Sequence, residues 1–396
     1  MKTQDGSSKS RSWLIVVPTA ILVLLGLIWS GFWYWSTTAA EATMTAWRVR
    51  EADAGRVYGC ATTNFGGYPF RIEVECAEPS VDDRATALSI RAHNLAAVAQ
   101  VWDPTLVIGE IVGPLTVAPL GGSPTATVDW TLAQASLRGT PGAPERLSIV
   151  IDKPNLAAAP SGGGPLAAAE HLEFHGRFAP ESTPGHPVLD LALDLRNATT
   201  PALVSALGTF GPLVSASTDL SIVAVLRGAS DLAPKPLQQE LREIQAAGGR
   251  LEITNARLHQ GDLIATAVGA LSLTARGTLA GDVRLTVVNF TKIIPWLGLD
   301  RAVAQAVRPD TLNRFAPALD RLMPGLGNVL RSRDNAGGNA SADGTKPDVN
   351  TALGVAVLGG QQTELEGRRA VSLTLHFDDG VAFLGPLKIG QVPPLY

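Results

Sequence analysis

The stretch Gly66-Gly67-Tyr68-Pro69-Phe70-Arg71-Ile72-Glu73-Val74-Glu75-Cys76 predicts a β-hairpin turn and the strand that follows it. Two glycines and a proline in its first half mark the turn. From Arg71 to Cys76 polar and apolar side chains alternate, which is typical of a half-buried strand. Short alternating runs separated by Gly and Pro recur along most of the chain, so we expect a mainly β fold.

The same turn lies between the only two cysteines of the chain, Cys60 and Cys76. A hairpin centred on the turn would place the two thiols on facing strands. In an oxidising compartment we expect a disulfide between them, which on the chain-entropy model stabilises the fold by about 3 kcal/mol. Two buried free thiols are the alternative, and they would remain open to alkylation.

The composition disfavours several classes of protein. Of the 396 residues, 45% are hydrophobic and only 17% are charged, against about 25% charged in an average soluble chain. The 40 glycines and 27 prolines disfavour a helical bundle, because these residues are the poorest helix formers. The high apolar content and the net charge of −4 disfavour disorder. Since there is no basic excess to neutralise phosphates, we expect no nucleic-acid partner.

The amino terminus has the pattern of a single membrane anchor. Residues 1–12 form a basic tail, and residues 13–35 contain no charged side chain. This run is long enough to cross a hydrocarbon core of about 30 Å, and aromatic residues cluster at its ends, as they do at membrane interfaces. A cleaved signal peptide, with a cleavage site within 37–42, is the alternative. In either case we expect the basic flank to stay in the cytoplasm and the bulk of the chain to be exported, and the anchor reading predicts a single-pass membrane protein.

The remainder is predicted to form one elongated, curved antiparallel β-sheet domain with a few packed helices. In chain order its predicted segments are a juxtamembrane helix at 36–55, a β-rich region at 56–330 with helices near 236–247 and 291–330, a flexible loop at 331–350, and strands at 351–396 that complete the same domain. The strands predicted before the first of these helices include 86–92, 106–117, 125–137, 147–153, 172–178, 188–196 and 220–227.

A tripeptide, Gly-Pro-Leu, occurs four times, beginning at Gly113, Gly164, Gly211 and Gly385. Proline cannot donate to a sheet ladder, so it belongs on a sheet edge or at the first residue of a strand. The recurrence predicts similar β units laid along one long sheet, with one unit near each end. Chance recurrence in a chain rich in Gly, Pro and Leu is the alternative.

The sharpest chemical candidate is His171-Leu172-Glu173-Phe174-His175. On a helix the two histidines would share a face and could hold zinc. The alternation of polar and apolar residues instead favours a strand with a solvated polar face. Asp378-Asp379-Gly380 reads as a hairpin turn rather than an acidic site. No nucleophile elbow, zinc-protease motif or phosphate-binding loop occurs, so we expect no catalytic residue, no metal, no cofactor and no enzymatic activity.

Three segments resemble the bacterial "domain of unknown function 2125" family. They are the hairpin with Gly67, Tyr68, Pro69, Phe70 and Arg71, the block from Asn94 to Pro104, and the carboxy-terminal block from Leu373 to Leu387. The resemblance implies a proteobacterial envelope protein with an amino-terminal anchor and implies no catalytic residue. More distantly, the strands from Asn255 to Phe290 are similar to the AsmA-like envelope proteins. That similarity implies a long, curved sheet with an apolar groove that handles lipid.

The residue pattern and the resemblance together favour a non-enzymatic envelope protein, anchored in the bacterial inner membrane with the bulk of the chain in the periplasm. It would bind or shield lipid-like ligands in an apolar β-groove. An envelope scaffold that binds another protein through its sheet edges is the alternative. A hydrolase with an unrecognised site is a third interpretation. The expected partners are the inner membrane and a lipid ligand, while the sequence identifies no protein partner.

Overall fold

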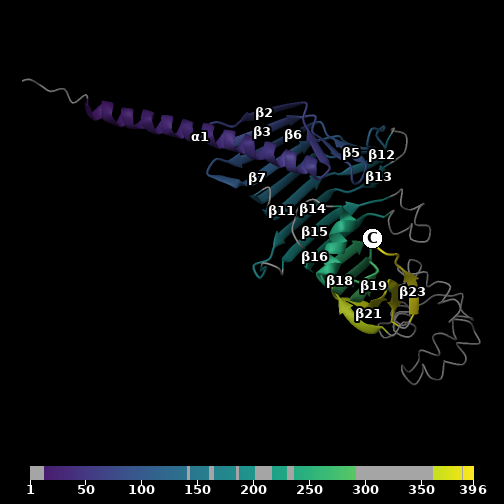
Figure 1. Ribbon diagram of the computed structural model, residues 1–396. Coiled ribbons are helices and arrows are strands. Elements are labelled where there is room, and N and C mark those ends of the chain that lie inside the picture. Colours follow the sequence, from purple (N-terminus) through teal and green to yellow (C-terminus); the bar gives the residue numbers. More distant parts are fainter. Residues whose placement is uncertain are drawn as a thin grey trace, which may run out of the picture.

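The computed structural model describes residues 13–140, 143–159, 165–183, 187–200, 216–229, 236–290, 360–385 and 387–396 (Figure 1). The basic tail, the predicted helix at 291–330 and the predicted loop at 331–350 lie outside the described residues. The described part is mainly β, with an apolar amino-terminal helix followed by large antiparallel sheets, so the predicted fold class is confirmed.

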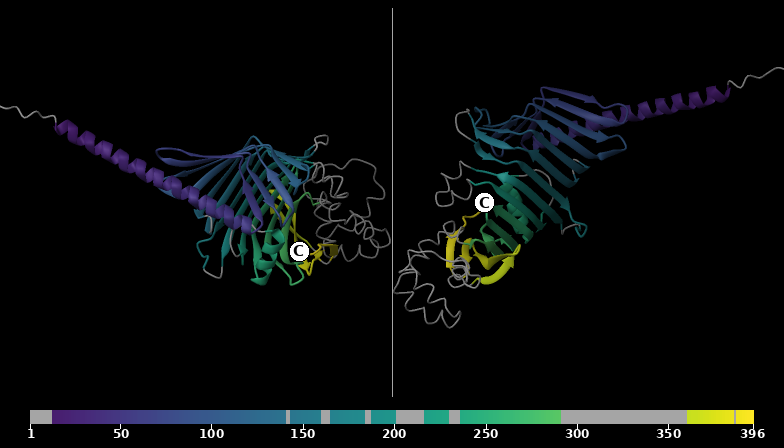
Figure 2. Two further views of the ribbon diagram at one scale, coloured as in Figure 1. Left: turned by 45° about the horizontal axis from the view of Figure 1, so that its top comes forward. Right: turned by 180° about the vertical axis from the view of Figure 1, so that it is seen from behind.

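The amino-terminal helix α1 is one continuous element, Trp13–Asp53. It covers both the predicted membrane run and the predicted juxtamembrane helix, and at 1.5 Å per residue it is about 60 Å long. Gly55, in the left-handed region at φ +90°, follows its end and turns the chain into the first strand. Among the described residues, α1 is the one helix long and apolar enough to cross a membrane. Its amino-terminal half projects away from the sheets (Figures 1 and 2).

Most strands belong to one sixteen-stranded antiparallel sheet that twists and curves along its length and does not close (Figure 2). In spatial order its strands are β2 (Thr62–Gly66), β3 (Arg71–Ala77), β6 (Asn94–Gln100), β7 (Asp103–Val112), β10 (Leu132–Thr140), β11 (Ala143–Asp152), β14 (His171–Phe178), β15 (Val188–Ala198), β16 (Thr218–Arg227), β17 (Arg250–Gln260), β18 (Leu263–Leu273), β19 (Leu279–Val288), β21 (Arg368–Asp378), β22 (Val381–Leu384) and β23 (Leu387–Gln391), with β20 (Gln361–Leu365) paired to β21.

A second, seven-stranded sheet corrects the prediction of one long sheet. In spatial order it contains β1 (Arg56–Gly59), β4 (Ser80–Asp83), β5 (Leu88–Arg91), β8 (Leu115–Pro119), β9 (Ala126–Asp129), β12 (Asn155–Ala158) and β13 (Pro165–Ala168). The chain alternates between the two sheets. It leaves the large sheet after β3, forms β4 and β5 in the small sheet, returns to the large sheet at β6, and repeats this alternation as far as β14. We call the line where the chain passes between the two sheets the crease.

Short breaks at the crease interrupt two strands that the sequence predicts as continuous, 106–117 and 125–137. The first is broken at Gly113-Pro114, where proline cannot donate to the ladder. The second is broken at Trp130-Thr131, and the Trp130 indole donates a 2.8 Å hydrogen bond to the Ile111 carbonyl. A Cβ atom on Gly113 would lie 3.4 Å from the Trp130 ring. The two breaks therefore pack against each other and fix the crease.

The Gly-Pro-Leu stretches at the two ends of the chain have different surroundings. The one at Gly113 takes the chain from the large sheet to the small one, whereas the one at Gly385 joins β22 to β23 within the large sheet. The prediction of similar β units is therefore wrong for this pair. Proline marks the crease on three outgoing strands, at Glu78-Pro79, Gly113-Pro114 and Lys153-Pro154.

The second described helix, α4 (Leu237–Ala246), lies within the predicted segment 236–247 and ends before Gly248, at φ +65°. It connects β16 to β17 and packs on β18. The predicted turn at Asp379-Gly380 is confirmed, since both residues have positive φ and join β21 to β22. The main core cluster lies at this carboxy-terminal end and contains Leu263, Val287, Phe290, Val371, Leu373 and Leu384.

Candidate functional site: an apolar sheet face

Residues paired laterally across the large sheet form unbroken apolar rows. Residues opposite each other on neighbouring antiparallel strands project from the same face. One row crosses thirteen strands, from β2 to β21, and contains no polar side chain: Phe65, Val74, Ala97, Gly109, Ala135, Ile149, Phe174, Leu193, Ile222, Ala256, Ala267, Leu285 and Leu373. At about 4.8 Å between strands, this row is roughly 58 Å long.

Two further rows flank it and also contain no polar side chain. The row toward the crease consists of Ala133, Ile151, Leu172, Leu195, Leu220, Leu258, Ala265, Val287 and Val371. The row on the other side consists of Ile72, Ala99, Val107, Leu137, Leu147, Gly176, Leu191, Ala224, Ile253, Gly269, Val283 and Leu375. We call the surface formed by these three rows the apolar face.

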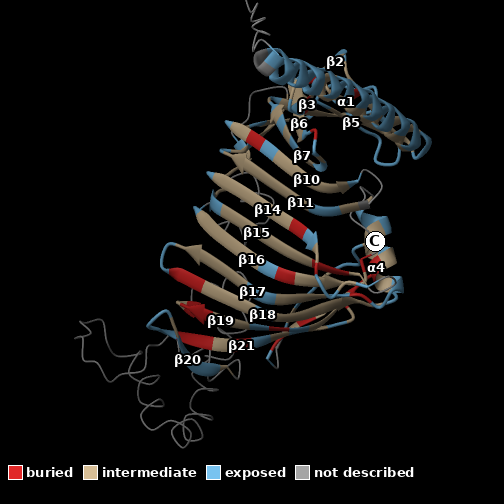
Figure 3. Ribbon diagram, turned by 90° about the vertical axis from the view of Figure 1, so that its left-hand side faces the viewer, coloured by how far each residue is buried: buried red, intermediate tan, exposed pale blue. Residues whose placement is uncertain are grey.

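Burial of the apolar face differs along the sheet. At the carboxy-terminal end Val287, Val371 and Leu373 are 1–3% exposed. In the middle, Phe174 and Leu193 are only half-buried, although their strands pair on both sides, while Ala224 of β16 on the same face is 3% exposed. Figure 3 shows most of the middle of the large sheet at intermediate burial. Within the described ranges, the part of the middle around Phe174 and Leu193 therefore lacks the cover that completes a core.

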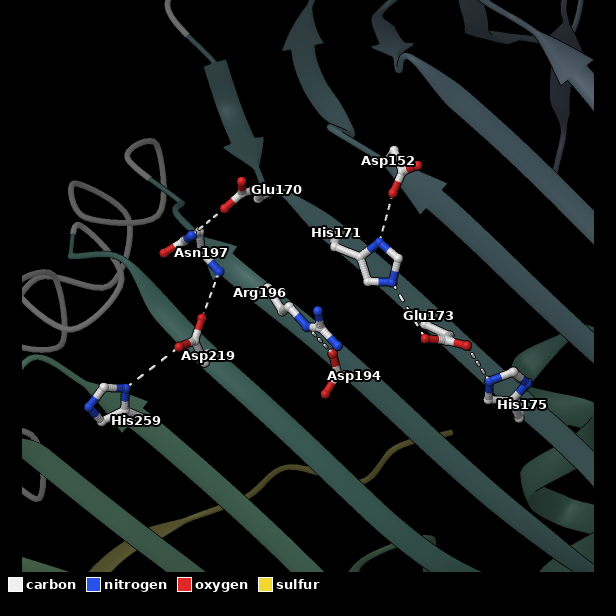
Figure 4. A network of polar contacts seen from close by, with 10 residues as sticks. All are labelled: Asp152, Glu170, His171, Glu173, His175, Asp194, Arg196, Asn197, Asp219 and His259. Carbon is white, nitrogen blue, oxygen red and sulfur yellow. Dashed lines mark hydrogen bonds and ion pairs between the residues drawn. The ribbon is translucent and has the colours of Figure 1, made fainter.

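The opposite face of the same strands carries a polar network (Figure 4). On β14, Nε2 of His175 and Oε1 of Glu173 are 2.7 Å apart, while Nε2 of His171 lies 3.4 Å from Oε2 of Glu173. Nδ1 of His171 is hydrogen-bonded to Asp152 at 2.7 Å, and Nδ1 of His175 is hydrogen-bonded to Ser148 at 2.8 Å, both partners lying on β11. The segment is a strand, as predicted, and its polar residues share the face opposite Phe174.

These contacts shift two pKa values in directions that favour ion pairing. The hydrogen bond to Asp152 is the largest cause that raises the pKa of His171 above its ordinary value of 6.5. Hydrogen bonds from His175 and then His171 lower the pKa of the Glu173 carboxyl below 4.5. At mildly acidic pH the network therefore holds His171 as an imidazolium beside ionised carboxylates.

A second part of the network lies nearer the crease (Figure 4). The Asn197 side-chain amide donates to Glu170, and the Asn197 backbone N–H donates to Asp219 at 2.8 Å. Asp219 in turn lies 3.5 Å from Nδ1 of His259. No group of three or more His, Cys, Asp or Glu residues in the described part of the chain has a geometry that could hold a metal ion. The polar side chains satisfy one another along the strands instead of converging on one point.

The predicted disulfide between Cys60 and Cys76 is confirmed, with a Cα–Cα distance of 5.4 Å. The predicted facing of the two thiols needs a correction. The residue opposite Cys76 in the β2–β3 hairpin is Thr63, while Cys60 precedes β2 in the connection from β1. The register is the same on both sides of this connection, Gly59 opposite Ser80 and Thr62 opposite Ala77, so the chain continues in one direction and Cys60 reaches Cys76 from the break between β1 and β2 at the crease.

The motif Gly67-Tyr68-Pro69-Phe70-Arg71 forms the tip of the β2–β3 hairpin and contacts α1. The Trp29 indole donates to the Pro69 carbonyl at 2.8 Å, and the Trp33 indole donates to the Arg71 carbonyl at 2.8 Å. The Tyr68 and Ser30 hydroxyls are 2.9 Å apart. A Cβ on Gly67, at φ +96°, would lie 2.6 Å from the Arg71 carbonyl oxygen, so this tight turn requires glycine.

Sequence reasoning missed the pairing of this motif with α1, and it missed Trp102 altogether as a site residue. The Phe70 ring lies 6.1 Å from the Trp29 ring and 6.4 Å from the Trp102 ring. A usable signal was present at both hairpin tips, because an aromatic residue is followed directly by a charged one in Phe70-Arg71 and Trp102-Asp103.

Together these features define a class of protein: a single apolar helix attached to an open antiparallel sheet with one continuous apolar face. The chain belongs to the family described as "uncharacterized protein conserved in bacteria" (DUF2125), whose family model matches residues 33–393. A search of curated proteins finds no match. The distant similarity to the AsmA-like proteins is not tested by these comparisons and stays an expectation.

Proposed function

We propose that the protein is a non-enzymatic envelope protein, anchored in the bacterial inner membrane, that binds or shields acyl chains on the apolar face in the periplasm. The observation that carries the proposal is the half-buried middle of the apolar face. A soluble domain rarely leaves so large a continuous apolar surface without a function. Burial of each methylene group of a ligand against it would contribute about 0.8 kcal/mol.

The location in this proposal follows from three features at the amino-terminal end. Helix α1 is long and apolar enough to span a bilayer. The basic tail favours a cytoplasmic amino terminus. The Cys60–Cys76 disulfide fits an oxidising compartment such as the periplasm.

The polar network supports a role other than catalysis. Its groups lie along a sheet face and bond one another, with Glu173 held between two histidines. An acid–base site needs a titratable group within reach of a bound substrate, in a position that excludes water. The network therefore fits a solvated outer face that keeps the middle strands soluble.

The test is photo-crosslinking of the full chain, in detergent micelles, with a fatty acid that carries a diazirine near its methyl end. We expect mass spectrometry to map the crosslinks to apolar-face residues of β10 to β17. Ile222→Gln and Leu193→Gln should each reduce this labelling several-fold. Val223→Gln is the matched control, because Val223 follows Ile222 on β16, projects from the opposite face and is 43% exposed.

Two outcomes would overturn the proposal: labelling divided equally between the two sheet faces, or labelling confined to α1. Circular dichroism of each variant separates loss of the ligand from loss of the fold. If Ile222→Gln unfolds the protein, the Leu193→Gln variant and the crosslink map of the unmodified chain still decide the question.

A second candidate function, protein binding through sheet edges, is favoured by the open ends of both sheets. The strand orders end at β13 and β23, and in the ladders of the described residues each has a neighbour on one side only, apart from an isolated bridge between Ala168 of β13 and Thr199. An added strand could pair there. Crosslinks to a co-purified protein at β13 or β23, with no lipid labelling of the apolar face, would support this candidate over lipid binding.

A further inference from the structure

The tips of two hairpins carry exposed aromatic side chains next to α1. Tyr68 and Phe70 lie at the β2–β3 tip, and Trp102 lies at the β6–β7 tip. The Phe70 ring contacts those of Trp29 and Trp102, and the Tyr68 ring lies 5.3 Å from the Trp33 ring. We call Tyr68, Phe70 and Trp102 the tip aromatics.

Contacts within the protein leave most of each ring uncovered. Tyr68 and Phe70 are each 60% exposed, and Trp102 is 59% exposed. Three aromatic residues so exposed on two adjacent turns form a concentrated apolar patch. Packing on α1 therefore does not account for them, and the patch needs a further partner.

The position of the tip aromatics along α1 identifies that partner. They contact α1 at Trp29, Ser30 and Trp33, in the aromatic end of its uncharged run. Tryptophan and tyrosine at such an end favour the headgroup level of a bilayer. The charged residues Arg71 and Asp103 follow the tips directly, so the apolar part of each tip is shallow.

We propose that the tip aromatics dock into the headgroup region of the bilayer that α1 spans, on the exported side. The inference rests on the membrane anchor of the proposed function and is independent of lipid binding by the apolar face. The two hairpins then hold the edge of the large sheet against the membrane, and the thirteen-strand apolar row begins next to this contact, at Phe65.

The test measures the depth of a fluorescent label in the full chain, reconstituted in vesicles of phosphatidylethanolamine and phosphatidylglycerol. Because the two native cysteines are disulfide-bonded, a single introduced cysteine is the only reactive thiol. The label is placed in separate variants at Gln100, which is exposed beside the β6–β7 tip, at Leu24 in the anchor, and at Ala85 in the β4–β5 turn. Ala85 lies near Gly55, and the end of α1 there is about 27 Å beyond Trp35 along the helix.

We expect lipids with a headgroup nitroxide to quench the label at Gln100 several-fold more than the label at Ala85. Lipids with a nitroxide deep in the acyl chain should quench Leu24 most strongly. Replacing two of the three tip aromatics, Phe70→Gln with Trp102→Gln, should reduce quenching at Gln100 to the level at Ala85 and leave Leu24 unchanged. The matched control is Leu120→Gln, an exposed leucine at the turn after β8, which should change neither signal.

The outcomes separate the two proposals. If Leu24 is shielded by lipid while Gln100 is quenched only by aqueous iodide, the docking inference is wrong and the anchor stands. If Leu24 is also quenched by iodide, the membrane anchor itself is wrong. Quenching at Gln100 that survives the double substitution would show that Phe70 and Trp102 are not the docking groups, which also overturns the inference.

Discussion

Leu193 and Leu373 lie in the same row of the apolar face, yet their environments differ. The row runs from Leu193 on β15 through four intervening strands to Leu373 on β21, with every residue in lateral register. Leu373 is 3% exposed, whereas Leu193 is half-buried. Leu193 has a ladder partner on each side, whereas Leu373 is paired only with Leu285 of β19, so the less completely paired position is the more buried one and pairing does not determine burial here.

The difference is the presence of a second apolar layer. At the carboxy-terminal end the core also includes Phe290 and Leu384, with Ile389 of β23 packed against it. The middle strands have no comparable cluster in the part of the chain that the structure describes. The same alternation therefore forms a core at one end and leaves a surface that an apolar ligand can cover in the middle.

The largest effect is expected at the covered end. Leu373→Ala should lower the free energy of unfolding by about 3.5–5 kcal/mol, because a buried leucine leaves a cavity when truncated. Urea denaturation followed by circular dichroism measures this change. A loss below about 1 kcal/mol would contradict the assignment of this end as the core.

Removal of the disulfide tests the other end of the sheet. The Cys60→Ser, Cys76→Ser double variant should lose about 3 kcal/mol, because the bond closes a loop between residues 16 apart in the sequence. Reduction of the unmodified protein is the control and should give the same loss. If neither treatment changes the denaturation midpoint, the amino-terminal end is held by its contacts with α1 instead.

Much of the fold could be predicted because alternation is a local signal. The pattern of β14 predicts a strand with His171 and Glu173 on one face and Phe174 on the other. The turn at Asp379-Gly380 follows from the residue types that tolerate positive φ. The crease could not be predicted, because it depends on contacts between distant segments, such as that of Trp130 with Gly113.

The candidate site was only partly accessible to sequence reasoning. Each strand's pattern predicts an apolar side, but a shift of two residues between strands would keep that side and change the rows. Which part of the face becomes covered depends on where β22 and β23 fold back. The contacts of Tyr68 and Phe70 with α1 also join segments about 40 residues apart, which no local pattern specifies.

A smaller effect on stability is expected in the middle of the sheet. Leu193→Ala should cost about 1 kcal/mol, because a half-buried side chain loses less transfer free energy than a buried one and leaves no closed cavity. The measurement is the same urea titration, run without added lipid and then with a saturating single-chain fatty acid. We expect the gap between this variant and the unmodified protein to widen with fatty acid. A cost equal to that of Leu373→Ala would show that the middle is covered.

The smallest effect belongs to the polar face behind these strands, and it depends on pH. The raised pKa of His171 means that its contribution is complete below about pH 6.5 and is lost as the pH rises through the folded-state value. The lowered pKa of Glu173 means that its contribution is present above about pH 4.5 and is lost as the pH falls through its folded-state value. Both contributions therefore coincide between about pH 4.5 and 6.5.

His171→Gln should accordingly destabilise the protein most near pH 5.5 and least near pH 8.5, by less than about 1 kcal/mol because the pair is partly solvated. Urea midpoints of the variant and the unmodified protein at the two pH values measure the difference. His93→Gln, at an exposed histidine outside the network, should show no such trend. A trend of opposite sign would mean that burial, rather than Asp152, dominates the pKa of His171. In that case the polar face would be covered and the middle of the sheet would not be a single layer with solvent behind it.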